Sequence, residues 1–207
     1  MTLVTLENLK PSYIASKLLV NSKVYLQEKV CFESGKCYIV EATSGKGKSS
    51  LLNIIYGVHA HYEGTLTYNG IDASRIKRDQ ISYVFQDLKL FDELTAWENV
   101  TLKNSITSHK SVQEMEALFI SFGLEPQIHQ SAATLSLGQQ QRVAIIRALC
   151  MPYKLLLLDE PFSHLDDENL RIIMEIIKQD STEQRASVII ASLGNSELIA
   201  ADHILEL

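Results

Sequence analysis

Several features are scarce in this 207-residue sequence, and each scarcity excludes a class of protein. The three cysteines, Cys31, Cys37 and Cys150, are an odd number without the spacing of a metal site, which favours reduced thiols in a reducing compartment. Lys and Arg number 19 against 25 Asp and Glu, a net charge of −6. The chain therefore lacks the basic excess of a general nucleic-acid binder, and we expect no nucleic-acid partner.

Long apolar runs and a secretion signal are also missing. The first residues, MTLVTLENLKPSY, alternate like a strand and carry the acidic Glu7, unlike the charged start and apolar run of a signal peptide. Fully apolar runs such as residues 155–158 are far shorter than the ~20 residues that span a bilayer. We expect a soluble chain whose membrane role comes through a partner.

Most of the sequence alternates between strand-like and helix-like segments, without repeats or a Pro/Gly-rich linker. Strands are predicted at residues 36–42, 65–68, 81–85, 154–159, 187–192 and 203–207, and a helix at 49–56. Buried, unbroken apolar strands separated by helices are typical of a mostly parallel sheet. The predicted fold class is therefore α/β.

Residues 96–148 show helix signals and no convincing strand. Ser111 and Glu114 form a capping box, apolar residues follow at helical spacing to Phe122, and Gly123 is a suitable helix stop. A second apolar stripe runs from Leu170 to Ile177. We assign both stripes to core packing and predict a helical lobe inserted into the α/β core.

A glycine-containing loop, ATSGKGKSS at residues 42–50, lies between a predicted strand and a predicted helix. It matches the end of the phosphate-binding (Walker A) pattern, in which backbone N–H groups and a helix N-terminus surround phosphate oxygens. Lys48 can reach the β- and γ-phosphates and the Ser49 hydroxyl can bind Mg²⁺. The alternative is an ordinary surface loop. The nucleotide-binding residues expected here are Thr43, Ser44, Gly45, Lys46, Gly47, Lys48, Ser49 and Ser50.

Two carboxylates end the buried strand LLLLDEP at residues 155–161. A strand that holds Asp159 rigidly suits Mg²⁺ coordination beside a phosphate loop. Glu160 can then orient and deprotonate the attacking water. The alternative, a solvated acidic turn, is weakened by the phosphate loop upstream.

The segment LSLGQQQR at residues 135–142 distinguishes among phosphate-loop ATPases. Ser136 and Gln139 form a capping box, so a helix begins here, and a serine and a glycine at a helix start make a second anion site. The segment resembles the L-S-G-G-Q signature of the ATP-binding cassette (ABC) transporter ATPases. The resemblance covers nearly the whole chain.

Membership of this family implies a P-loop NTPase core with an N-terminal antiparallel β portion and an inserted helical subdomain. It places the nucleotide-binding core at residues 1–86 and 150–207, and the helical subdomain at 87–149. It also implies that two cassettes bind ATP and Mg²⁺ as a head-to-tail homo- or heterodimer. Ser136, Gly138 and Gln139 would then contact the nucleotide of the partner.

Further positions resemble the family pattern. Tyr13 matches an aromatic residue that stacks on adenine, and Gln86 matches a glutamine that contacts Mg²⁺ and the water. The stretch DLKLFDELTAWENV after Gln86 resembles the region that meets the transmembrane permease. SHLD, at residues 163–166, resembles the loop that touches the partner cassette. The sequence of this region is most similar to that of the lipoprotein-release and cell-division branch of the ABC ATPases.

Three positions depart from the pattern. Ala42 replaces the leading glycine of the phosphate loop, which would strain the chain only if that site needs a positive φ. Leu137 replaces the first glycine of the signature, which is tolerable if the close approach is at Gly138. Leu193 stands where the family has a histidine that contacts the γ-phosphate, so we expect slow hydrolysis.

These features predict an ATPase subunit that powers a membrane permease from the cytoplasmic face of the cell membrane. Lys48, Gln86 and Glu160 are its predicted catalytic residues, and Ser49, Gln86 and Asp159 its metal ligands. The alternative is a hydrolysis-poor, regulatory ATP-binding cassette paired with another subunit. A role in DNA repair or translation is disfavoured, because the chain holds one cassette without a coiled-coil insert.

Overall fold

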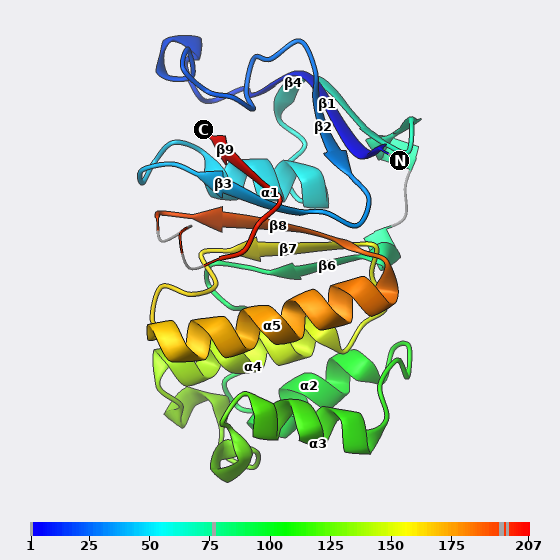
Figure 1. The fold of residues 1–207 in the computed structure, drawn as a ribbon, viewed down its shortest axis with the longest axis vertical. Helices are drawn as coiled ribbons and strands as arrows, with labels where there is room; N and C mark the ends of the chain where they lie inside the picture. Colours follow the sequence, from blue (N-terminus) through cyan, green and yellow to red (C-terminus); the bar gives the residue numbers. More distant parts are fainter. Residues whose placement is uncertain (1, 76–77, 195–196, 198) are drawn as a thin grey trace.

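The computed structural model describes residues 2–75, 78–194, 197 and 199–207. Its strands form two sheets that are stacked with helices in layers (Figure 1). The strands are β1 (Thr2–Pro11), β2 (Val30–Glu33), β3 (Cys37–Glu41), β4 (Tyr62–Tyr68), β5 (Ile71–Asp72), β6 (Ile81–Val84), β7 (Leu155–Asp159), β8 (Ser187–Ser192) and β9 (His203–Glu206). The helices are α1 (Lys48–Tyr56), α2 (Ala96–Asn104), α3 (Val112–Ser121), α4 (Leu137–Leu149) and α5 (Asp167–Gln184). Short 3₁₀ turns lie at Ser16–Leu18, Ala73–Arg75, Arg78–Gln80, Glu125–Gln127 and Ala132–Thr134.

One sheet is parallel and the other antiparallel, as predicted. The parallel sheet has the strand order β6-β7-β8-β3-β9, and the antiparallel sheet has the order β2-β1-β4-β5. The alternating N-terminal segment forms β1, which pairs with β2 and β4. The predicted strands and the helix at 49–56 are all present within a few residues of their expected ends.

The faces of the parallel sheet carry separate hydrophobic clusters. Leu155 and Leu157 of β7 pack with α1 and the antiparallel sheet, whereas Leu156 and Leu158 pack with α4 and α5. This alternation follows from the two-residue period of a strand. Helix α1 therefore lies between the two sheets, as the ribbon also shows (Figure 1).

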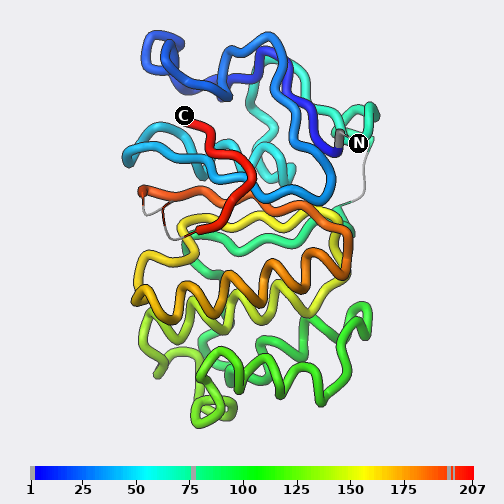
Figure 2. Tube along the Cα trace, in the orientation of Figure 1, coloured from blue at the N-terminus to red at the C-terminus, as the bar shows by residue number. Residues whose placement is uncertain are grey.

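The middle of the chain is helical, as expected, and begins with a helix that the sequence analysis did not delimit. Thr95 and Glu98 form a reciprocal capping box at the start of α2, and Ser111 and Glu114 do the same for α3. Helix α3 ends at Ser121, with Gly123 following at a φ of 63°. The tube shows α2 and α3 together at the end of the molecule remote from the antiparallel sheet (Figure 2).

None of the described helices combines the length and the apolar character needed to cross a bilayer.

Candidate functional site

The phosphate loop connects β3 to α1, the strand–loop–helix order that the sequence predicts. Gly47 caps α1 with a φ of 92°, and a Cβ there would lie 2.9 Å from Ile14 Cδ1. The position therefore suits glycine both in conformation and in space. The hydroxyl of buried Tyr25 donates to the Gly47 carbonyl at 2.7 Å, which fixes the end of the loop.

The replacement of the leading glycine by Ala42 has no conformational consequence. Ala42 does not have a positive φ, and its N–H donates to the Ser192 carbonyl at 3.4 Å. The loop thus tolerates alanine without the strain that a left-handed position would impose.

Lys48, the first residue of α1, is buried, with 4% of its surface exposed. Its ammonium donates to the Ala42 carbonyl at 2.7 Å and to the Thr43 carbonyl at 3.4 Å. Glu160 Oε1 lies 3.4 Å from the same nitrogen. The two sequence motifs are therefore brought into contact, because β7 and β3 both run parallel to β8 between them.

Asp159 is a buried carboxylate with one oxygen that has no hydrogen-bond partner among the described residues. Its Oδ2 accepts a bond from the Tyr83 hydroxyl at 3.4 Å, whereas Oδ1 is orphaned. Burial raises the pKa of Asp159, and the neighbouring Glu160 carboxylate acts in the same direction. A buried carboxylate oxygen in this state is a suitable ligand for a cation.

The other expected metal ligands adjoin Asp159. Ser49 Oγ donates to Gln86 Oε1 at 3.4 Å, and Ser49, Gln86 and Asp159 line one cavity. Among the described residues no cluster of three His, Cys, Asp or Glu side chains could bind a metal alone. The donor set is therefore one hydroxyl, one amide and one carboxylate, which leaves a cation positions for phosphate oxygens.

Glu160 follows β7 in a left-handed conformation, with a φ of 49°. This conformation is uncommon for a side chain larger than glycine, and such residues gather at functional sites. Its N–H donates to the Ala191 carbonyl at 2.9 Å, which holds the turn against β8.

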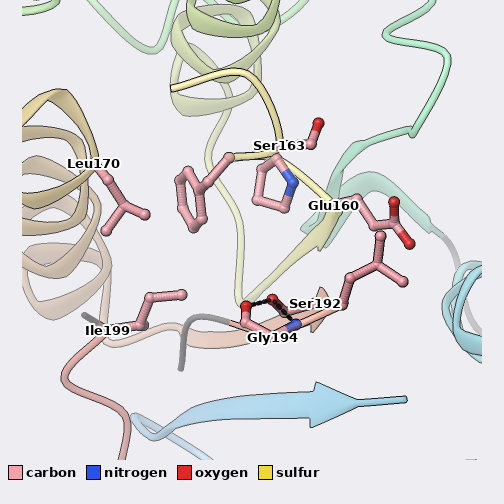
Figure 3. A pocket seen from close by; sticks show the side chains of 9 residues that line it. Glu160, Ser163, Leu170, Ser192, Gly194 and Ile199 are labelled. Carbon is pink, nitrogen blue, oxygen red and sulfur yellow. Dashed lines mark hydrogen bonds between the residues drawn. The ribbon is translucent and has the colours of Figure 1, made fainter. Parts of the chain in front are cut away.

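Figure 3 shows a cavity of about 260 Å³ beside Glu160. Glu160 and Ser163 line it from the segment after β7. Ser192, the last residue of β8, and the following Leu193 and Gly194 line it from the other side. Leu193 is 55% exposed and offers only carbon atoms.

The signature segment starts α4 as predicted. Ser136 Oγ accepts from the Gln139 N–H at 3.3 Å, and Gln139 Oε1 accepts from the Ser136 N–H at 2.8 Å. Leu137 is 47% exposed, so its side chain points away from the packed helix face. The close approach is at Gly138, where a Cβ would lie 2.8 Å from the His164 carbonyl oxygen. In the described part of the chain, no hydrogen bond joins Ser136, Gly138 or Gln139 to the phosphate loop.

Tyr13 lies beside the phosphate loop and is 57% exposed. Its hydroxyl donates to Ser50 Oγ, and its ring centroid is 5.7 Å from that of His59. An exposed aromatic face at the edge of the loop is available for stacking.

Sequence reasoning missed three supporting residues. Tyr25 and Tyr83 donate to Gly47 and Asp159, and Arg147 of α4 donates to the carbonyls of the segment after Gln86. Isolated aromatic residues and a helical arginine carry no local signal, because their partners lie far away in sequence.

Comparisons with known proteins agree with this arrangement. The profile of the family described as ABC transporter matches residues 27–163. The tungstate uptake system ATP-binding protein TupC of Peptoclostridium acidaminophilum is 36% identical over 90% of this chain and 85% of its own length. The lipoprotein-releasing system ATP-binding protein LolD 2 of Chlorobium chlorochromatii is 32% identical over 98% of this chain and 90% of its own.

A solved structure has the same fold over nearly all of both chains. It is the ATP-binding cassette MJ0796, a dimer in a post-hydrolysis state bound to ADP and Pi. It is 27% identical, with a TM-score of 0.80 over 99% of this chain and 94% of that chain. The chain belongs to the ABC transporter family and is one of its ATP-binding subunits. Members of this family bind and hydrolyse ATP.

Proposed function

We propose that the chain binds MgATP at the loop before α1 and hydrolyses it with Glu160 as the base. The observation that supports this most strongly is the meeting of three groups at one place. Lys48 contacts the loop carbonyls, Glu160 lies 3.4 Å from it, and Asp159 next in the chain has an orphaned buried oxygen.

The triphosphate would be surrounded by the N–H groups of Thr43, Ser44, Gly45, Lys46, Gly47 and Ser50. Lys48 would exchange its carbonyl contacts for the β- and γ-phosphate oxygens. The exposed ring of Tyr13 would stack on the adenine.

The residues Ser49, Gln86 and Asp159 would hold Mg²⁺ together with phosphate oxygens. The ion would supply positive charge to the oxygens of the transferred phosphoryl group. Glu160 would accept a proton from a water molecule as that water attacks the γ-phosphorus. The bond to the β-phosphate oxygen then breaks, and ADP and phosphate are the products.

Two such chains would form a head-to-tail homo- or heterodimer in which Ser136, Gly138 and Gln139 contact the nucleotide of the partner subunit. Two observations support this assembly: no hydrogen bond joins the two anion sites within the described part of the chain, and MJ0796 is a dimer in its solved structures.

A transmembrane permease would meet the helical subdomain, residues 87–149, and place the chain on the cytoplasmic face of the membrane. Exposed Phe91 and Leu102 support this, because they line a cavity of about 340 Å³ beside the segment after Gln86. The relatives are named as ATP-binding proteins of transport systems.

Hydrolysis would be slow in the isolated chain, because Leu193 has no hydrogen-bond donor for the γ-phosphate. Loss of one such donor reduces a rate by about 10²–10³-fold.

The proposed function is tested by MgATP turnover of the purified chain beside Glu160→Gln, with the molecular mass recorded with and without ATP. We expect slow turnover that Glu160→Gln abolishes, and an ATP-dependent dimer that Glu160→Gln stabilises. Equal turnover of the two proteins would contradict the catalytic role of Glu160.

The effect of Leu193 is tested by Leu193→His. Turnover should rise by at least about tenfold, equivalent to ~1.4 kcal/mol of barrier. A smaller rise would mean that the missing histidine does not limit the rate.

A further inference from the structure

The cavity beside Glu160 has a shortage of side-chain donors. Leu193 supplies none, and the Ser192 hydroxyl is engaged with its own chain, donating to the Gly194 carbonyl and accepting from the Gly194 N–H. Figure 3 shows this pair closed on itself at the floor of the cavity, away from Ser163. A donor in place of the one that Leu193 lacks must therefore come from another residue.

His164 lies on the same segment as Glu160 and can donate a hydrogen bond. Its side chain is exposed, and its Nδ1 lies 2.8 Å from Ser163 Oγ. Ser163 Oγ also accepts an N–H from buried Gln141 at 2.8 Å. A serine oxygen that accepts the amide N–H keeps its own proton free to donate to Nδ1, and in that arrangement Nε2 carries the ring N–H. This arrangement places an N–H donor on an exposed side chain.

The placement of His164 favours the nucleotide of a partner subunit over its own. The His164 carbonyl packs directly against Gly138, so the histidine belongs to the same surface as the signature segment. The cavity beside Glu160 is lined by Ser163 but not by His164. If the signature segment contacts the nucleotide of the partner subunit, His164 lies next to that nucleotide as well.

We propose that His164 of each protomer donates a hydrogen bond from Nε2 to the γ-phosphate bound by its partner, in place of the donor that Leu193 lacks. This rests on the head-to-tail dimer proposed above. The bond stabilises developing negative charge and transfers no proton. His164 would thus be a catalytic residue acting in trans, and the residual turnover of the wild-type chain would depend on it.

The first test is a double-mutant cycle of His164→Ala with Leu193→His, measured as MgATP turnover of the full chain. His164→Ala should reduce wild-type turnover by at least about tenfold, with the KM for ATP changed much less than kcat. In the Leu193→His background the same substitution should change turnover by less than about twofold, because the donor is restored in cis. Exposed His129 supplies the matched control, since His129→Ala should leave turnover unchanged in both backgrounds.

An equal loss in both backgrounds would show a merely structural role for His164 and overturn the proposal. No loss in the wild-type background would also overturn it.

The second test uses mixed dimers with two affinity tags to separate action in trans from action in cis. A dimer of one Glu160→Gln chain and one His164→Ala chain retains one site with both Glu160 and the partner's His164. It should keep about half of the wild-type turnover. A dimer with both substitutions in one chain and none in the other should be nearly inactive. The reverse result would show that His164 acts in cis and would overturn the proposal.

The Leu193→His protein separates this inference from the proposed function. If turnover of that protein depends on Glu160 but the double-mutant cycle does not give the expected result, the proposed role of His164 is refuted and the proposed ATPase function stands. Absence of turnover and of an ATP-dependent dimer in that protein would refute both.

Discussion

At the scale of single residues, Asp159 is a carboxylate in an unfavourable environment. Its carboxylate is buried, its Oδ1 is unpartnered among the described residues, and burial raises its pKa. The ionised form therefore destabilises the nucleotide-free protein, as is common where a binding site is prepared for a charged ligand.

We predict that Asp159→Asn raises the melting temperature of the nucleotide-free chain while abolishing Mg²⁺-dependent turnover. Each 1 kcal/mol gained corresponds to about 2–4 °C for a domain of this size. Because the pKa is higher in the folded chain, the folded state binds the proton more tightly. The cost of ionisation thus grows from the usual pKa of 3.8 up to the raised pKa of the folded chain and is constant above it, so the gain should be larger at pH 7 than at pH 4.

Asp180 supplies the matched control for this measurement. It is also buried but has partners on both oxygens, with Lys110 at 2.7 Å, the Tyr153 hydroxyl at 2.7 Å and Gln184 at 2.8 Å. Asp180→Asn leaves Lys110 without its ion-pair partner and should lower the melting temperature. If both substitutions shifted the temperature in the same direction, the orphaned oxygen would not explain the effect at Asp159.

At the scale of elements, α4 supports the segment that follows Gln86. The Arg147 guanidinium donates to the carbonyls of Leu88 at 2.5 Å and Lys89 at 2.6 Å. Both residues have a positive φ, of 59° and 50°, which is unfavourable for side chains of their size. A planar fork that binds two successive carbonyls holds this turn in place.

We predict that Arg147→Ala lowers stability by about 1–3 kcal/mol and increases amide hydrogen exchange at residues 86–91. Arg147→Lys should lower stability and increase exchange almost as much, because an ammonium cannot bridge both carbonyls in a fixed plane. Thermal melting and exchange mass spectrometry supply the measurement. Arg171→Ala, at an exposed position of α5, is the control and should change neither. Unchanged exchange in Arg147→Ala would exclude the anchoring role.

At the scale of the whole molecule, one hydrophobic cluster connects the helical region with the parallel sheet. Phe119 of α3 and Val100 of α2 belong to the same cluster as Leu158 and Ile190 of the sheet. The helical subdomain proposed at residues 87–149 therefore does not have a core of its own.

We predict that the chain unfolds in a single cooperative transition. Trp97, the one tryptophan of the sequence, packs on Phe119 with ring centroids 5.9 Å apart and reports on the helical region alone. Its fluorescence and the far-UV circular dichroism of the whole chain should follow the same urea curve. Phe119→Ala should lower the free energy of unfolding by about 3–5 kcal/mol and shift both midpoints together to lower urea concentrations. Separate curves for the two probes would indicate an independently folding helical domain.

Much of the fold and of the candidate site follows from local patterns. Ser136 with Gln139 and Ser111 with Glu114 cap helices across three residues, and Gly47, Lys48 and Ser49 are adjacent, so such signals are complete within a short segment. Thr95 with Glu98 carried the same signal at α2. The strand β2 had no such pattern, because its four residues are defined by pairing with β1.

The sequence by itself determined the family, the phosphate loop, the two carboxylates and the signature helix, since each depends on residue types at short spacing. Only the tertiary structure decided that Ala42 is unstrained, that Gly138 is pressed against His164, and that Asp159 Oδ1 lacks a partner. These contacts join residues that are far apart in the chain. Backbone conformation and the packing of distant segments settle them, and neither is encoded in a local pattern.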